Sequence, residues 1–132
     1  MVLCAAACGA SGHDPLTPRF PVPGVYALQT VNGSRLPITG TGLDSTISVY
    51  VADTLTLAAD QTLAHVQTFR HTPPGGQTTT TQEHETGRWS ATDSVITARF
   101  DASADTETGT FTAGSTLTLI DNFFGDVFVY RK

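Results

Sequence analysis

The residues best suited to chemistry in this sequence lie on a hairpin that carries histidine and carboxylate side chains. The segment LAHVQTFRH (residues 63–71) runs into Pro73-Pro74-Gly75-Gly76, which favours a chain reversal, and QEHETGRW follows. A two-residue loop would place His65 opposite His84, whereas a three-residue loop would place His65 opposite Glu85. Cβ atoms that face each other across two strands lie ~4.5–5.5 Å apart, so either register brings ionisable groups together.

Three interpretations of this hairpin are open. Two histidines and one carboxylate could bind Zn²⁺ or Cu²⁺. Period-2 alternation places His65 on one face with Gln67 and Phe69, which favours an inward His65–Glu85 pair that acts as a polar anchor in a ligand pocket. The third interpretation is a hairpin surface with ordinary polar residues. We expect no metal and no cofactor.

The other acidic and nucleophilic residues form no recognisable site. Asp101, Asp105 and Glu107 in DASADTE could chelate Ca²⁺, but they lack the EF-hand spacing and are predicted to form a solvated turn. The sequence has no Gly-x-Ser-x-Gly, P-loop or HExxH motif. No arrangement of Ser, His and Asp indicates nucleophilic catalysis, so the chain is predicted not to be an enzyme.

The N-terminal segment MVLCAAACG carries both cysteines of the chain. It resembles the end of a bacterial lipoprotein signal peptide, in which small residues such as Ala5–Ala7 precede a cysteine that becomes acylated, here Cys8. A complete signal peptide has a basic start and a longer apolar region, so we expect the native start codon to lie upstream of Met1. The alternative is a plain apolar N-terminus.

A proline-rich segment follows the cysteines. Residues 9–23 contain four prolines and show no periodicity, which predicts an extended spacer that could hold a domain up to roughly 45 Å from an anchor. We therefore divide the chain into a signal and tether segment, residues 1–23, and a folded domain, residues 24–132.

Composition limits the class of partner. The 132 residues include 7 Lys and Arg against 12 Asp and Glu, which gives a net charge of -5. Nucleic-acid-binding proteins carry basic clusters, which this sequence lacks, and the same balance disfavours electrostatic binding to a membrane surface. Membrane contact is expected only through the lipid anchor, and the domain is expected to be a monomer.

The pattern from residue 24 onward is typical of an all-β protein. Short runs of alternating apolar and polar residues recur at ~8–12-residue spacing, separated by turn signals. Residues 45–51 and 54–59 could form one bent strand or two, and Gly87 is a candidate bulge. We predict an antiparallel up-and-down meander that closes into a barrel of about eight strands.

The alternation also predicts which side chains face inward. These are Tyr26, Leu28, Leu55, Leu57, Leu63, Phe69, Trp89, Ile96, Phe100, Phe111, Leu117, Leu119, Phe128 and Tyr130. A barrel of this size is filled by side chains or holds one small ligand. The candidate pocket residues are Tyr26, His65, Gln67, Glu85, Trp89, Phe111 and Phe128.

Five segments in this order resemble the bacterial lipocalin-like lipoproteins: VYALQTVNGSRLP, LTLAADQTL, TGRWSATDSVITARF, TGTFTAGSTLTL and the closing FVYRK. The resemblance implies a calycin-type barrel, anchored in the bacterial cell envelope, without defined catalytic residues. Gly24-Val25-Tyr26 stands where lipocalins carry Gly-x-Trp.

Two functions therefore remain. The first is a binding protein that holds a small apolar or amphiphilic ligand. The second is a packed structural or interaction barrel, similar to barrel-shaped inhibitors, that contacts envelope proteins. A void lined by the aromatic rings would favour the first, and mutual ring contact would favour the second.

Overall fold

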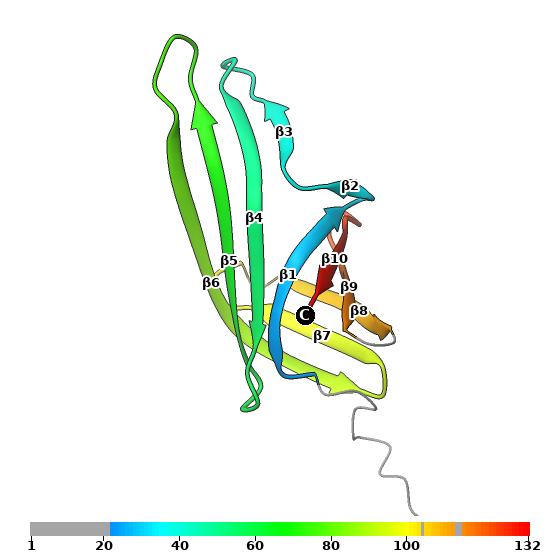
Figure 1. The fold of residues 1–132 in the computed structure, drawn as a ribbon. Helices are drawn as coiled ribbons and strands as arrows, with labels where there is room; N and C mark the ends of the chain where they lie inside the picture. Colours follow the sequence, from blue (N-terminus) through cyan, green and yellow to red (C-terminus); the bar gives the residue numbers. More distant parts are fainter. Residues whose placement is uncertain (1–21, 104, 113–114) are drawn as a thin grey trace, which may run out of the picture.

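The computed structural model describes residues 22–103, 105–112 and 115–132, which form strands and turns without a helix (Figure 1). Among these residues no helix is available that could span a membrane. The strands are β1 (Gly24–Val31), β2 (Ser34–Arg35), β3 (Ile38–Thr41), β4 (Ile47–Leu57), β5 (Thr62–Thr72), β6 (Thr79–Thr92), β7 (Val95–Phe100), β8 (Thr106–Thr112), β9 (Thr116–Asp121) and β10 (Val127–Arg131).

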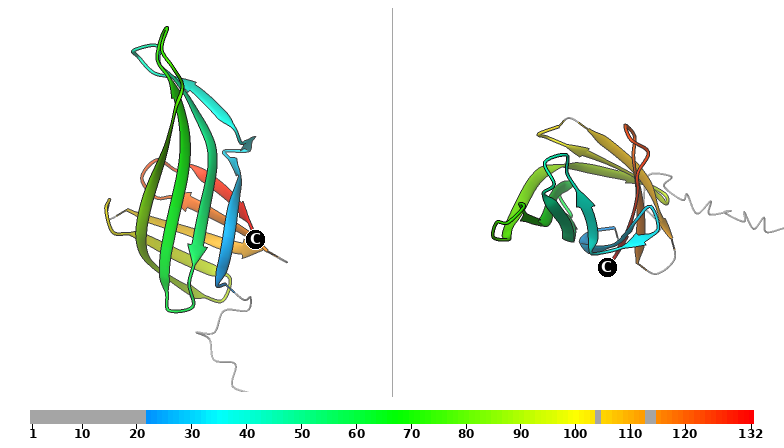
Figure 2. Two further views of the ribbon diagram at one scale, coloured as in Figure 1. Left: turned by 60° about the vertical axis from the view of Figure 1, so that its left-hand side comes forward. Right: turned by 90° about the horizontal axis from the view of Figure 1, so that it is seen from above.

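The strands form one closed antiparallel barrel. Strands β4 to β10 pair in sequence order, and β1 pairs with both β10 and β4, which closes a ring of eight strands (Figure 2). This confirms the predicted all-β, up-and-down barrel. Residues 45–59 contribute one strand rather than two, and the short strands β2 and β3 were not predicted.

The barrel is closed along only part of its height. The last pair between β1 and β4 is Ala27↔Thr54; beyond it β1 pairs with β2, and β4 pairs with β3. Strands β4, β5 and β6 continue past the other strands and form, with β3, an extension that we call the flap (Figures 1 and 2). The opposite end, where β1 begins, is called the tether end.

A bulge in β4 lies just inside the point where β1 and β4 separate. The register shifts between Tyr50↔Phe69 and Ala52↔Thr68, so Val51 is the extra residue. Because the bulge resets the alternation, both Tyr50 and Asp53 point to the inner side, although they are three residues apart.

The apolar core fills the barrel toward the tether end. Of the fourteen side chains predicted to face inward, twelve are buried, and Phe69 and Phe128 are half-buried. Val22, which the sequence places in the tether, is 1% exposed and belongs to this core. Its carbonyl oxygen accepts a hydrogen bond of 2.5 Å from the hydroxyl of Tyr26, so the barrel begins before Gly24.

Gly87 is not a bulge, which corrects the prediction. It pairs in regular register with Leu63 on one side and Phe100 on the other, and a Cβ atom there would lie 2.0 Å from the carbonyl oxygen of Arg99. Gly109 has the same environment on β8, where a Cβ atom would lie 1.9 Å from the carbonyl oxygen of Thr118. Both glycines let neighbouring strands of a small barrel approach closely.

Replacing Gly109 with Ala is therefore expected to lower the free energy of unfolding by about 1–3 kcal/mol, as overpacking does. Gly40→Ala on β3 is the matched control, because no atom lies within 4 Å of a Cβ atom there, and it should change stability by less than about 0.5 kcal/mol. Urea denaturation followed by circular dichroism measures both. Equal stability of the two variants would contradict the close approach.

Candidate functional site

A buried hydrogen-bond cluster occupies the interior between the apolar core and the flap, and Asp53 is its centre. Asp53 is 3% exposed. Its Oδ2 accepts hydrogen bonds from the Nε2 of His65 at 2.8 Å, from the hydroxyl of Tyr130 at 3.0 Å and from the hydroxyl of Tyr50. The side-chain amide of Gln67 donates to the Tyr50 oxygen at 2.9 Å. Strands β4, β5 and β10 thus contribute to one network.

Both tyrosines of the cluster act as donors. Burial, followed by the negative charge of Asp53, raises the pKa of Tyr130 well above its ordinary value. The same two causes, in the same order, raise the pKa of Tyr50. Each phenol therefore keeps its proton at neutral pH and can stabilise the Asp53 carboxylate.

His65 lies between two carboxyl groups. Its Nε2 donates to Asp53, and its Nδ1 lies 3.6 Å from Oε2 of Glu85, too far for a direct hydrogen bond. Burial alone would lower the pKa of His65, but the hydrogen bond to Asp53 and the charges of Asp53, Glu107 and Glu85 outweigh it, so the pKa is raised. Protonation turns Nδ1 into a donor that faces Glu85.

The register decides between the two predicted arrangements of the hairpin. His65 pairs with Glu85, as the three-residue-loop alternative predicts, although the observed connection is longer and spans residues 73–78. His84 pairs with Val66 and is exposed, so the observed register does not bring His65 and His84 together. Within the described ranges, no group of three or more His, Cys, Asp or Glu side chains could hold a metal ion.

Glu107 brings a further carboxyl group to the interior. Burial raises its pKa to about 7; nearby His65 lowers it, and the charges of Asp121, Asp53 and Glu85 raise it. The sequence placed Glu107 in a solvated turn with Asp101 and Asp105. That expectation holds for the two exposed aspartates but not for Glu107, which lies on β8 and is partly buried.

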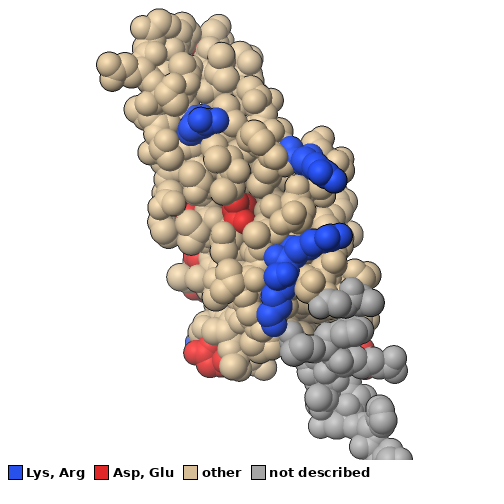
Figure 3. All heavy atoms as spheres, viewed as in Figure 1, with Lys and Arg blue, Asp and Glu red and all other residues tan. Residues whose placement is uncertain are grey.

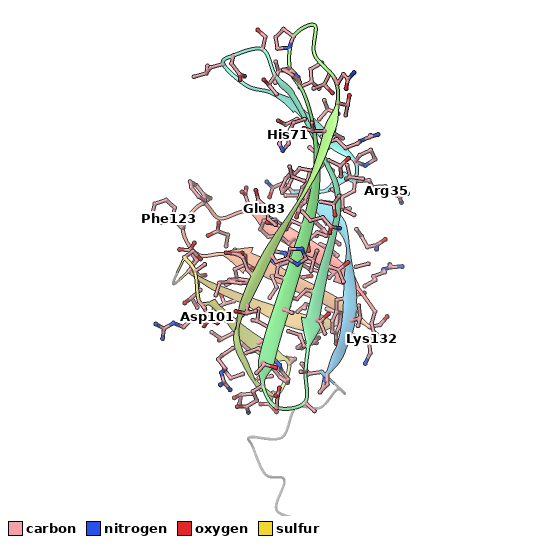
Figure 4. All side chains as sticks on the ribbon, turned by 90° about the vertical axis from the view of Figure 1, so that its left-hand side faces the viewer. Arg35, His71, Glu83, Asp101, Phe123 and Lys132 are labelled. Carbon is pink, nitrogen blue, oxygen red and sulfur yellow. The ribbon has the colours of Figure 1, made fainter. Side chains whose placement is uncertain are left out.

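An aromatic column continues from the cluster into the flap. The rings of Tyr50 and Phe69 are stacked with their centroids 4.8 Å apart, and the imidazole of His71 stacks on Phe69 at 6.1 Å. The Nδ1 of His71 lies 3.0 Å from the hydroxyl of Ser48. Figure 4 shows His71 on the flap, above Glu83 on β6. All three stacked rings are only half-buried, so an apolar surface is accessible beside the polar cluster.

The structure separates the predicted pocket residues into two groups. His65, Gln67 and Glu85 lie in the polar cluster, whereas Phe128 is half-buried and packs against the apolar core. Tyr26, Trp89 and Phe111 belong to the packed core. The Tyr26 and Phe111 rings are 6.1 Å apart, and the indole N–H of Trp89 donates to the carbonyl of Ala58 at 2.9 Å. Cys8, the predicted lipidation site, lies outside the described residues.

Sequence reasoning missed Asp53, Tyr50 and Glu107. Asp53 lies on the same period-2 row as Leu55 and Leu57, and that alternation could have placed it inside. Glu107 likewise shares a row with Phe111. Tyr50 is on the opposite parity from Asp53, so only the bulge brings them together, and no residue pattern marks that bulge.

The titration of Glu107 predicts how stability depends on pH. A carboxyl group whose pKa is raised on folding binds its proton more tightly in the folded state, so stability falls as pH rises from the unfolded value near 4.5 to about 7. His65, whose folded pKa is also raised, adds a loss in the same direction above its unfolded value of 6.5.

We expect Glu107→Gln to flatten this profile, because glutamine keeps the neutral shape without a charge. The variant should match the wild type near pH 5 and be more stable at pH 8. Thermal unfolding between pH 5 and 8 measures the effect, with Asp105→Asn as the exposed control. Parallel profiles for wild type and Glu107→Gln would show that Glu107 does not titrate in this range.

No protein-family model matches this chain, and no curated protein matches it significantly.

Proposed function

We propose that this barrel binds a small amphiphilic molecule beside the polar cluster, with the apolar part of the ligand along Phe69 and Tyr50. The observation that carries the proposal is His65: its side chain is 8% exposed, and its Nδ1 has no hydrogen-bond partner among the described residues. The Oδ1 of Asp53 is buried and unpartnered as well.

Such atoms are costly in a barrel that serves only as a scaffold. A buried polar atom without a partner costs about 1–3 kcal/mol, so a packed interior is normally completed by apolar side chains, as it is around Leu55 and Leu117. A polar group kept at this cost is common where a ligand or a proton is handled. The polar cluster around Asp53 therefore indicates a binding function rather than a purely structural one.

The neighbouring side chains remain accessible, which a binding site requires. The Glu85 side chain is 30% exposed, and Tyr50 and Phe69 are half-buried. Figure 3 shows acidic atoms exposed near the middle of one face, with uncharged atoms around them. An apolar surface next to convergent polar groups is the usual composition of a small-molecule site.

Native mass spectrometry of the protein purified from its own source tests the proposal. We expect a retained adduct in the wild-type protein that is lost or reduced in a Phe69→Ser variant. Val25→Ser, which changes an exposed side chain on β1, is the control and should retain the adduct. A spectrum with only the bare chain, together with no binding of added amphiphiles, would contradict the proposal.

We also propose that the barrel is attached to the bacterial cell envelope through an acylated Cys8, because AAAC followed by glycine resembles a lipoprotein signal. The protein should be expressed from its gene together with the native upstream sequence. Cys8→Ser should then move it from the membrane fraction to the soluble fraction, whereas Cys4→Ser should not. Unchanged fractionation of both variants would contradict the anchor.

A second candidate function, an interaction barrel, is favoured by one observation. Phe123 and Phe124 on the β9–β10 turn are 80% and 75% exposed, and their rings contact each other edge to face. Phe123 projects from the barrel in Figure 4. If this turn contacts an envelope protein, cross-linking in cells should be lost in a Phe123→Ser, Phe124→Ser double variant, while the ligand adduct should persist.

A further inference from the structure

We infer that the ligand carries a cationic, hydrogen-bond-donating head such as a primary amine, and that Glu85 and Glu107 bind that head. This inference rests on the proposed binding function and specifies the chemical class of its ligand. The inference is based on the charge of the interior, where several carboxyl groups lie without a Lys or Arg side chain of the described residues beside them.

The charged side chains of the described chain are sorted by location. Every Lys and Arg within it is exposed: Arg35, Arg70, Arg88, Arg99, Arg131 and Lys132. Asp53 is buried, and Glu85, Glu107 and Asp121 are partly buried on strands of the barrel; Asp126, also partly buried, lies in the β9–β10 turn and accepts a hydrogen bond from Asn32. His65 is the one ionisable nitrogen that contacts these inner carboxyl groups among the residues described. A cationic head would therefore enter an interior whose charge is not yet compensated.

The hydrogen bonds of the cluster also indicate a ligand with a hydrogen-bond-donating head. The three strong donors of the cluster, which are the Tyr50 and Tyr130 hydroxyls and the Nε2 of His65, all point to Oδ2 of Asp53. The structure gives Glu85 and Glu107 no hydrogen-bond donor from another described residue. The two carboxyl groups thus offer acceptors without a donor from the described part of the protein, and a complementary head group must supply the donors.

His65 gives the site a way to release the ligand. The Nδ1 of His65 lies 3.6 Å from Oε2 of Glu85. When His65 is protonated, its positive charge therefore lies beside a carboxyl group that would bind the ligand. The proton and the cationic head therefore compete. Glu107, whose pKa burial raises to about 7, must also lose its proton before it can bind a cation, so binding should be coupled to proton release from both groups and should strengthen as the pH rises.

Isothermal titration calorimetry with octylamine, 1-octanol and octanoate tests the inference, because the three probes differ only in their head groups. We expect octylamine to bind at least about tenfold more tightly than either of the others at pH 7, a ratio typical of one charge-assisted hydrogen bond. Its affinity should rise severalfold between pH 6 and pH 8, where the amine itself stays protonated.

Two isosteric variants provide the controls. Glu85→Gln removes one carboxylate of the site and should weaken octylamine binding about tenfold while leaving 1-octanol unchanged. Asp60→Asn removes one charge from the exposed β4–β5 turn at the tether end and should leave the affinity within about twofold, which separates local contact from net charge. Circular dichroism checks that both variants fold.

The possible failures are distinguishable. Equal affinity for the three probes, or tighter binding of octanoate, would overturn the cationic ligand and leave the binding function standing. Equal losses in Glu85→Gln and Asp60→Asn would also overturn it, because the effect would then come from net charge. If none of the three probes binds, both this inference and the proposed amphiphile site fail.

Discussion

Asp53→Ala is expected to lower the free energy of unfolding by about 3–5 kcal/mol, the usual cost of removing one partner from a buried charged network. The Asp53 carboxylate accepts hydrogen bonds from Tyr50, His65 and Tyr130, and alanine would leave all three donors inside the barrel without an acceptor. Urea denaturation followed by tryptophan fluorescence measures the loss.

Two further variants serve as controls for Asp53→Ala. Asp105→Ala changes an exposed aspartate in the β7–β8 turn and should alter stability by less than about 0.5 kcal/mol. Asp53→Asn keeps one acceptor oxygen and should fall between alanine and wild type. An Asp53→Ala protein as stable as the wild type would mean that the network contributes nothing to folding.

Trp89→Ala should produce a loss of similar size, about 3–5 kcal/mol, through a different cause. Trp89 is 7% exposed in the packed core, and its indole N–H donates to Ala58 in the turn between β4 and β5. Alanine would leave a cavity at the tether end and remove one of the two hydrogen bonds that the Ala58 carbonyl accepts, the other coming from the Gln61 N–H. Trp89→Phe keeps most of the ring volume and should cost about 1–2 kcal/mol, chiefly through the lost hydrogen bond.

The fluorescence of the wild-type protein gives an independent check of this location. Trp89 is the only tryptophan, so its emission should be blue-shifted and resistant to soluble quenchers. A red-shifted emission that quenchers suppress fully would place the ring outside. The inward faces of β6 and β7 would then be inverted.

The strands could be predicted because their side chains alternate and their turns carry strong local signals. Leu117 and Leu119 on β9 are fully buried between half-buried threonines, as the pattern predicts, and Asn32-Gly33 forms a two-residue turn with positive φ at both positions. The short strands β2 and β3 have no comparable pattern. Their position depends on the separation of β1 from β4, which is a property of the whole barrel.

The candidate site was also predictable only in part, because some of its contacts depend on closure of the whole barrel. His65 and Glu85 were placed together because one hairpin register relates them. Tyr130 joins them from β10, at the opposite end of the described chain, and Tyr50 joins them through a bulge. Periodicity along one strand carries no information about such contacts, because they form only when the ring closes.

The double pairing of β1 also determines the order in which the protein can fold. Strands β4 to β10 can pair with sequence neighbours as soon as they leave the ribosome, and β1 can pair with β4, but the second pairing of β1, with β10, must wait for the end of the chain. Asn32, at the end of β1, donates its hydrogen bond to Asp126, 94 residues away. Contacts of such high sequence separation form late, so folding should take milliseconds to seconds rather than microseconds. Until then the free edge of β10 is open to pairing with another chain, which makes the final closing step the one most sensitive to aggregation during synthesis.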